Sequence, residues 1–188
     1  MIHIQDFTFN SFQTRCSVVW DDSLSCAIVD PGCSSDAEIS ELTSFLSSRG
    51  LKPVCIMLTH GHFDHVLGVA DLVSRYDNLP VYMHPADKAT LAGNEYFTKW
   101  FGAPLPASFE TVDICEACSS EGCANGSSEC CTDGPDGPKC ISVIEVGGLR
   151  FNVIETPGHT PGSVCLVYGQ HLFSGDTLFQ GSCGRTDF

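Results

Sequence analysis

The sequence predicts a layered α/β fold that forms a single domain over residues 1–188, and three observations lead to this prediction. Short β-rich runs fill the beginning and the end of the chain, and helical patterns lie between them. Val54-Cys55-Ile56-Met57-Leu58 is a continuous apolar run of strand length, which is typical of a strand buried on both faces. A chain of 188 residues, 43% of them hydrophobic, is also long enough to bury one sizeable core.

The first 30 residues have the pattern of an antiparallel meander, which Pro31-Gly32 closes. Its β-rich runs lie at residues 2–4, 7–9, 17–20 and 26–30. Ser35-Asp36-Ala37-Glu38 is then a capping box, and apolar residues recur at helical spacing until Gly50. We therefore expect one helix between the meander and the buried strand.

Helix and strand patterns alternate after the buried strand, with helices expected at residues 66–76 and 85–91 and a strand at 81–83. A second β-rich half follows at residues 149–155, 164–168 and 171–174. The segment before it carries four aromatic side chains, Tyr96, Phe97, Trp100 and Phe101. These either cover a site as a lid or pack in the core, and we favour core packing.

Residues 103–148 are expected to form an acidic, cysteine-rich insertion in the domain. The stretch from Cys115 to Cys140 holds six of the 12 cysteines and no large apolar side chain, so it cannot build a core. Its Cys115-x-x-Cys118 pair lacks the second pair of a zinc ribbon. We interpret it as a flexible loop, with a structural metal or a redox role as alternatives. The remaining cysteines are expected to be buried thiols: Cys16, Cys26, Cys33, Cys55, Cys165 and Cys183.

The charge of the chain argues against binding to nucleic acid or to an anionic membrane, since 23 Asp and Glu oppose 9 Lys and Arg. No apolar run approaches the ~18 to 20 residues of a membrane span. The first residues, Met1 to Asp6, lack the pattern of a signal peptide. We therefore expect a cytoplasmic protein with a small-molecule partner, whose oligomeric state the sequence leaves open.

His60-x-His62-x-Asp64-His65 follows the buried strand directly, where functional loops of layered α/β folds concentrate. Side chains two residues apart in an extended segment point the same way, so His60 and His62 can share one metal ion. If a helix begins near His65, then Asp64 and His65 can be presented to a second ion nearby. The spacing thus indicates a centre with two ions.

Two later turns complete this set of ligands. Thr156-Pro157-Gly158-His159 places a lone histidine just after a strand, and Ser174-Gly175-Asp176-Thr177 does the same for a carboxylate. The two predicted ligand sets are His60, His62 and His159 for one ion, and Asp64, His65 and Asp176 for the other. Asp176 can bridge both ions.

In these segments the sequence resembles the metallo-β-lactamase superfamily. The T-H-x-H-x-D-H, G-H-T-P-G-S and G-D-T-L-F motifs of that superfamily stand at residues 59–65, 158–163 and 175–179. Asp30, in Val29-Asp30-Pro31-Gly32, matches the supporting acid near the metals. The likeness is greatest to small glyoxalase II-like hydrolases, whose pattern residues 179–188 follow. The resemblance implies an αββα sandwich with the site at one edge of the paired sheets.

One departure from the family concerns the second ion. The family supplies a further histidine a few tens of residues after the bridging Asp, whereas this sequence ends at Phe188. On that comparison the last strand and helix of the fold are missing, and so is the helical domain with which glyoxalase II binds glutathione. We therefore expect a fragment or a shortened protein whose second ion binds weakly.

The function that this resemblance implies is hydrolysis of a thioester such as S-lactoylglutathione by metal-bound hydroxide. A metal ion lowers the pKa of bound water to about 7, so no nucleophilic side chain is needed. Asp64 is expected to orient the hydroxide as the catalytic residue, with one or two Zn²⁺ ions, or iron or manganese in their place. His3, His84 and His171 are interpreted as structural.

Two other functions fit the same residues. Related persulfide dioxygenases hold a single iron with two histidines and one aspartate, at positions that match His60, His159 and Asp176. The second alternative is a shortened, Cys-rich metal-binding protein that keeps the fold and has no catalytic turnover. Metal analysis combined with activity on each substrate distinguishes these alternatives.

Overall fold

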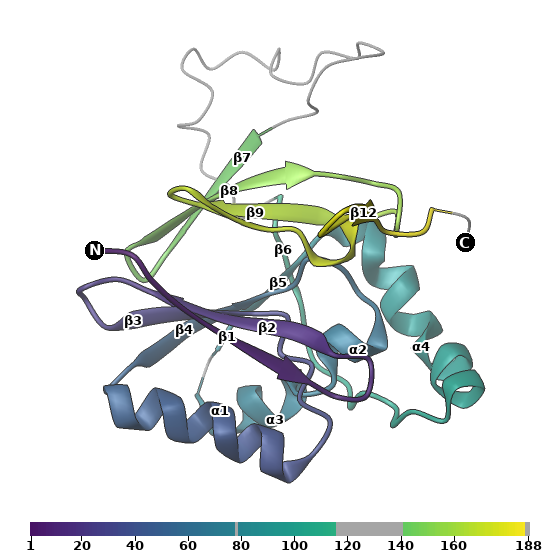
Figure 1. Cartoon of the computed structure of the whole chain (residues 1–188), viewed down its shortest axis with the longest axis horizontal. Helices are drawn as coiled ribbons and strands as arrows, with labels where there is room; N and C mark the ends of the chain where they lie inside the picture. Colours follow the sequence, from purple (N-terminus) through teal and green to yellow (C-terminus); the bar gives the residue numbers. More distant parts are fainter. Residues whose placement is uncertain (78, 116–140, 187–188) are drawn as a thin grey trace.

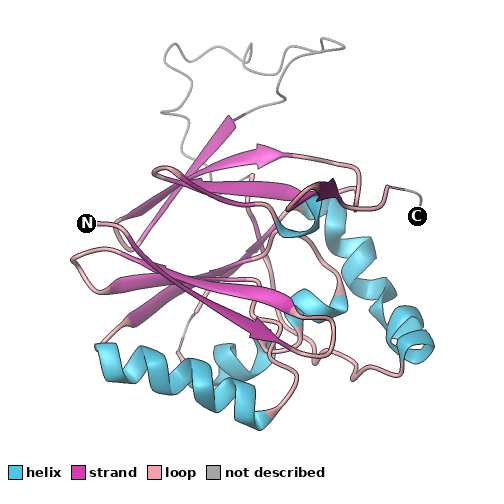
Figure 2. Ribbon diagram, viewed as in Figure 1, coloured by secondary structure: helices cyan, strands magenta, loops and turns pink. Residues whose placement is uncertain are grey.

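Two β-sheets lie face to face in the centre of the molecule, with helices along the outer face of the first sheet (Figures 1 and 2). The computed structural model describes residues 1–77, 79–115 and 141–186. The first sheet has the strand order β1-β2-β3-β4-β5-β6, and the second has the order β10-β9-β8-β7. This arrangement confirms the predicted layered α/β fold.

The strands of the first sheet are β1 (His3–Phe9), β2 (Thr14–Trp20), β3 (Ser25–Val29), β4 (Lys52–Met57), β5 (Val81–Met83) and β6 (Val112–Asp113). Those of the second are β7 (Ile141–Val146), β8 (Leu149–Glu155), β9 (Val164–Tyr168) and β10 (His171–Phe173). A small ribbon of β11 (Leu178–Phe179) and β12 (Ser182–Cys183) follows.

The predicted meander is confirmed, since β1, β2 and β3 pair antiparallel in order. The runs at residues 2–4 and 7–9 form one continuous strand rather than two. From β3 to β6 the pairing is parallel. The carboxyl ends of four neighbouring strands therefore lie at one edge of the sheet, where binding sites of open α/β sheets concentrate.

Helix α1 (Asp36–Arg49) has the ends that its sequence predicts. The hydroxyl of Ser35 accepts a hydrogen bond from the backbone N–H of Glu38, and Gly50 ends the helix in a left-handed conformation with φ of 67°. The buried side chains of α1, which include Ile39, Leu42 and Leu46, face the first sheet. The helix thus covers one face of that sheet.

The helix expected at residues 66–76 is instead two helices, α2 (Phe63–Val66) and α3 (Val69–Arg75). The break falls at Gly68, whose N–H donates to the carbonyl of Pro31 at 2.9 Å. A Cβ at this position would lie 2.9 Å from the same oxygen, so only glycine permits the approach. The contact joins α3 to the loop after β3.

The segment after β5 is more helical than the sequence predicts. The 3₁₀ turn η1 (Pro85–Asp87) leads into α4 (Lys88–Phe101), which includes the aromatic segment. Core packing was the wrong expectation for three of its side chains, because Tyr96, Trp100 and Phe101 are 65%, 74% and 58% exposed.

The expected insertion at residues 103–148 includes residues that belong to the two sheets. β6 pairs with β5 near its beginning, and β7 pairs with β8 near its end. The cysteine-rich part from residue 116 to residue 140 lies outside the described residues. Of the six other cysteines, five are buried as expected, whereas Cys183 is exposed.

Alternate residues of the predicted buried strand, in β4 and the residue after it, face two separate cores. Ile56 and Leu58 pack with the helices, and Cys55 and Met57 pack between the sheets. This confirms that the strand is buried on both faces. Over the described part of the chain, no helix combines the length and the hydropathy needed to cross a bilayer.

Phe151 on β8 is fully buried between the sheets, while the next residue, Asn152, is exposed. We expect Phe151→Ala to lower the free energy of unfolding by about 3 to 5 kcal/mol, because it removes a ring from a closely packed core. Asn152→Ala should change it by about 0.5 kcal/mol or less. Urea unfolding of both variants measures this, and equal effects would contradict the packing described.

Candidate metal centre

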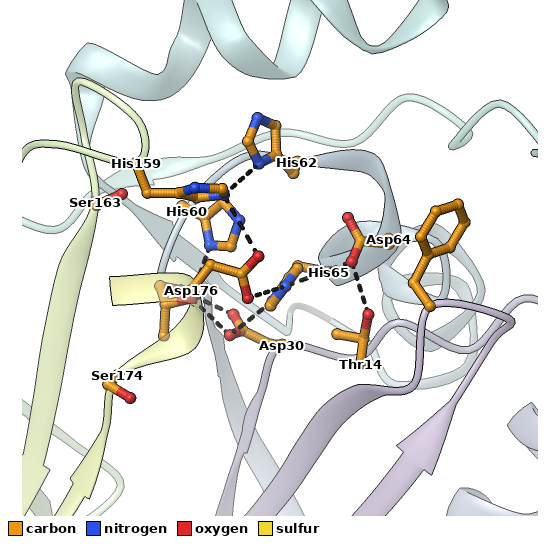
Figure 3. Close-up of polar contacts among 12 residues, drawn as sticks. Thr14, Asp30, His60, His62, Asp64, His65, His159, Ser163, Ser174 and Asp176 are labelled. Atoms are coloured by element: carbon orange, nitrogen blue, oxygen red, sulfur yellow. Dashed lines mark hydrogen bonds and ion pairs between the residues drawn. The ribbon is translucent and has the colours of Figure 1, made fainter. Parts of the chain in front are cut away.

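The six predicted ligands lie together at the edge where β4 ends (Figure 3). The loop after β4 carries His60 and His62, and α2 carries Asp64 and His65. His159 lies in the loop between β8 and β9, while Asp176 lies in the 3₁₀ turn η4 (Gly175–Thr177) after β10. Both sheets thus contribute to a single cluster.

Two groups of donor atoms have the spacing of metal sites. The first contains His60, His62 and His159, with donor atoms within 4.8 Å of one another. His62 Nδ1 lies 2.9 Å from His159 Nε2. The second contains His60, His65 and Asp176 within the same limit, so His60 belongs to both groups.

Asp176 faces both groups, as its predicted bridging position requires. Its Oδ1 lies 3.3 Å from His65 Nε2, and its Oδ2 lies 3.4 Å from His159 Nε2. Asp64 is at the margin of the second group, where its Oδ2 lies 3.5 Å from His65 Nε2. The same oxygen accepts a hydrogen bond of 2.7 Å from the hydroxyl of Thr14.

His60 shows that the residues fit a metal ion. Its side chain is buried, and its Nε2 has no hydrogen-bond partner. The ring lies among those of His62, His65 and His159, at centroid distances of 4.9, 4.2 and 4.9 Å. A buried nitrogen without a partner is costly, and a divalent cation is the ligand that this donor set suits.

Burial keeps the first group ready to bind a cation. It lowers the pKa of His60 well below the usual value, and the neighbouring histidines lower it further. Burial and His159 lower the pKa of His62 to about 4. Both imidazoles are therefore neutral near pH 7 and keep a lone pair for a metal.

Three aspartates surround the imidazole of His65 in the second group: Asp30, Asp64 and Asp176. Burial alone would lower the pKa of His65, but Asp30, Asp176 and Asp64 outweigh burial and raise it well above the usual value. Burial would likewise raise the pKa of Asp176, but the hydrogen bond from His65 and the nearby histidines lower it. The aspartates around His65 supply negative charge that attracts a cation.

Asp30 contacts the second group on the side of His65 that faces away from Asp176, in agreement with its predicted supporting role. Its carboxylate accepts hydrogen bonds from the N–H and the hydroxyl of Thr59 at 2.8 and 2.6 Å. Asp30 Oδ2 also lies 3.0 Å from His65 Nδ1. A carboxylate on the far nitrogen fixes the orientation of the imidazole and leaves Nε2 facing the centre.

Asp87, which the sequence analysis missed, connects the two loops that carry the histidines of the first group. Its Oδ2 accepts hydrogen bonds from the Gly61 N–H and the Thr160 hydroxyl at 2.7 and 2.8 Å. Its Oδ1 accepts one from the Gly162 N–H at 2.7 Å. A Cβ at Gly162 would lie 2.7 Å from the Asp87 nitrogen, so glycine is needed there.

Asn94 of α4 binds the same loop from the other side. Its side-chain amide donates to the carbonyl of Gly61 at 2.9 Å, and Asn94 is buried. Both backbone polar groups of Gly61, the residue between His60 and His62, are thus fixed by buried side chains. In the sequence, Asp87 has the pattern of a helix start, and nothing in its spacing connects it to residues 61 and 162.

These features define an α/β sandwich with a metal-type centre at the edge of its paired sheets. The family model of the metallo-β-lactamase superfamily matches residues 10–188. The chain therefore belongs to this superfamily. It is 29% identical over 190 residues to the hydroxyacylglutathione hydrolase GloC of Haemophilus influenzae, covering 100% of this chain and 77% of that protein. It is also 33% identical to a hydroxyacylglutathione hydrolase of Erwinia tasmaniensis over 88% of this chain, and spans only 47% of that protein.

Solved structures show the same relationship. BLEG-1 B3 metallo-β-lactamase superimposes with a TM-score of 0.74 and 30% identity over 98% of this chain and 77% of that one. TTHA1623, solved in a di-iron-bound form, gives a TM-score of 0.70 and 30% identity over 97% of this chain and 77% of that one. The fold is therefore the metallo-β-lactamase sandwich that the resemblance implied.

We expect Asp87→Asn to weaken metal binding about 10- to 100-fold, the usual effect of removing a partner that orients ligands. An amide has one acceptor oxygen, so its NH₂ group would face backbone N–H donors in place of the second oxygen. Competition with a chelating dye measures the affinity. Glu95→Gln on the exposed face of α4 is the control, and equal affinities in the two variants would contradict the role of Asp87.

Proposed function

We propose that the chain is a metal-dependent hydrolase of small-molecule thioesters, with S-lactoylglutathione as the representative substrate. The observation that carries this proposal is the buried, unpartnered Nε2 of His60 at the junction of two ligand groups. The name hydroxyacylglutathione hydrolase, which belongs to relatives at 29% and 33% identity, supports a thioester as the substrate class.

The ligand sets proposed are those of the sequence analysis. His60, His62 and His159 would hold one ion, and Asp64, His65 and Asp176 the other, with Asp176 shared. A divalent cation there supplies Lewis acidity and lowers the pKa of bound water. Zinc is the proposed metal, and the di-iron form of TTHA1623 makes iron the first replacement to test.

Asp64 is proposed to orient the attacking water. The Thr14 hydroxyl bonds its Oδ2 at 2.7 Å, which fixes the carboxylate plane beside His65. A fixed acceptor near the reacting atoms lowers the cost of orientation in the transition state. The leaving thiolate is stable at neutral pH, so the reaction needs no strong general acid.

A cleft of about 880 Å³ beside the centre provides space for the substrate. Asp64, His65 and Asp176 are among the residues that line it, together with Arg15 and Phe179. The cleft therefore adjoins the second ligand group. An acyl carbonyl bound beside these three residues would lie next to the proposed nucleophile.

The iron dioxygenase remains the second candidate, because its three expected ligands lie in one cluster. His60 and His159 have ring centroids 4.9 Å apart, and His159 Nε2 lies 3.4 Å from Asp176 Oδ2. That function predicts oxygen consumption with a persulfide by iron-loaded protein. The proposed hydrolase predicts thiol release from a thioester without oxygen consumption.

We expect His159→Ala to lower the metal content by about one equivalent and to reduce thioester hydrolysis at least ~10³-fold, since it removes a direct ligand. Metal analysis and a thiol-release assay on the same preparation measure both. His3→Ala is the control, because His3 stacks on the ring of Trp20 and is not one of the proposed ligands. Full activity of metal-depleted His159→Ala would refute the proposed function.

We expect Asp64→Asn to lower kcat about 10²- to 10⁴-fold while KM changes less than about threefold, because the carboxylate acts on the attacking water. Steady-state kinetics at saturating metal separate the two constants. Asp71→Asn, at an exposed position of α3, controls for the loss of one negative charge. An unchanged kcat would give Asp64 a purely structural role.

A further inference from the structure

A second, separate group of metal-type donors lies at the same edge of the sandwich. It consists of His84, Cys115 and Glu155, whose ligand atoms lie within 4.8 Å of one another. His84 follows β5 directly, Cys115 lies two residues beyond β6, and Glu155 is the last residue of β8. None of these residues takes part in the centre described above.

The topology explains why these three residues meet. β4, β5 and β6 are parallel neighbours, so their carboxyl ends lie side by side. The His60 loop follows the first of these strands, and His84 and Cys115 follow the other two. Glu155 reaches the group from the opposite sheet. The group thus joins the two sheets, and it lies beside the main centre because β5 is the neighbour of β4.

The spacing of the donors fits a shared ion better than a hydrogen bond. His84 Nε2 lies 3.8 Å from Glu155 Oε1, which exceeds the length of a hydrogen bond. Two nitrogen or oxygen ligands of one tetrahedral zinc ion are about 3.4 Å apart, given bond lengths near 2.1 Å. The side chains of His84 and Glu155 are only 15% and 31% exposed, so the pair is partly shielded from water.

We propose that His84 Nε2, Cys115 Sγ and a carboxylate oxygen of Glu155 bind a zinc ion distinct from the main centre. Imidazole, thiolate and carboxylate are all established zinc ligands, and the thiolate favours zinc over magnesium or calcium. An ion at this position links β5 and β6 to β8. It also lies near two segments that shape the main centre, because η1 with Asp87 follows His84 and the His159 loop follows Glu155.

Zinc binding at this site changes one identifiable hydrogen bond. His84 Nδ1 accepts a hydrogen bond from the backbone N–H of Ala86 at 3.2 Å. When Nε2 holds a metal, the imidazole proton resides on Nδ1, which then cannot accept. The Ala86 N–H must give up this bond, so its amide resonance reports directly on whether His84 is a ligand.

Cobalt substitution tests the site, because a cobalt–thiolate bond has a near-ultraviolet charge-transfer band that the six ligands of the main centre cannot produce. We expect this band when Co²⁺ is added to the full chain under reducing conditions. Cys115→Ser should abolish it, and His84→Asn and Glu155→Gln should each weaken Co²⁺ binding at least tenfold. Cys183→Ser, which removes an exposed thiol elsewhere, should retain it.

His84→Asn is chosen because asparagine keeps an acceptor for the Ala86 N–H and removes Nε2, so the variant preserves the start of η1. In the zinc-titrated wild-type chain we expect the Ala86 amide resonance to shift, and in His84→Asn to stay in place. A band that survives in His84→Asn with unchanged affinity, or in Cys115→Ser, would overturn the proposal. A band lost in Cys115→Ser but unaffected in both other variants would assign the metal to cysteines alone and overturn it equally.

Discussion

The crowding of four imidazole rings at the end of β4 is the constraint on which the rest of the structure depends. The ring centroid of His60 lies 4.2 to 4.9 Å from those of His62, His65 and His159. The centroids of His62 and His159 lie 4.7 Å apart. Such a cluster is unfavourable without a cation, because burial leaves few hydrogen-bond donors to satisfy the ring nitrogens. The orphaned Nε2 of His60 is the direct sign of this cost, and metal binding is the function that offsets it.

Two buried carboxylates hold the segments that carry these rings in place. Asp30 fixes Thr59 and His65 on one side, and Asp87 fixes the backbone of Gly61 and Gly162 on the other. Both accept hydrogen bonds from backbone N–H groups, which hold loops more rigidly than side-chain contacts alone. The parallel strands place the loops at one edge, and these carboxylates then set the positions of the histidines within it.

Local patterns in the sequence were sufficient to predict α1 and the buried strand, because each depends on neighbours in the chain. Four of the proposed ligands, from His60 to His65, also stand in one such pattern, whereas His159 and Asp176 gained their meaning only in combination with it. The capping box at Ser35 and the spacing from His60 to His65 are examples. Asp87 was beyond such reasoning, since its partners lie 26, 73 and 75 residues away. The break at Gly68 and the exposure of Trp100 also depend on tertiary contacts, which periodicity does not contain.

The most direct test of the account is an anomalous difference map at the zinc absorption edge, from crystals of the full chain grown with Zn²⁺. The account predicts one peak within bonding distance of the His60, His62 and His159 nitrogens. It predicts a second peak beside His65 and Asp176, on the side facing Asp64. Crystals saturated with zinc that show no peak at His60 Nε2 would contradict the claim that the imidazole cluster is a metal centre.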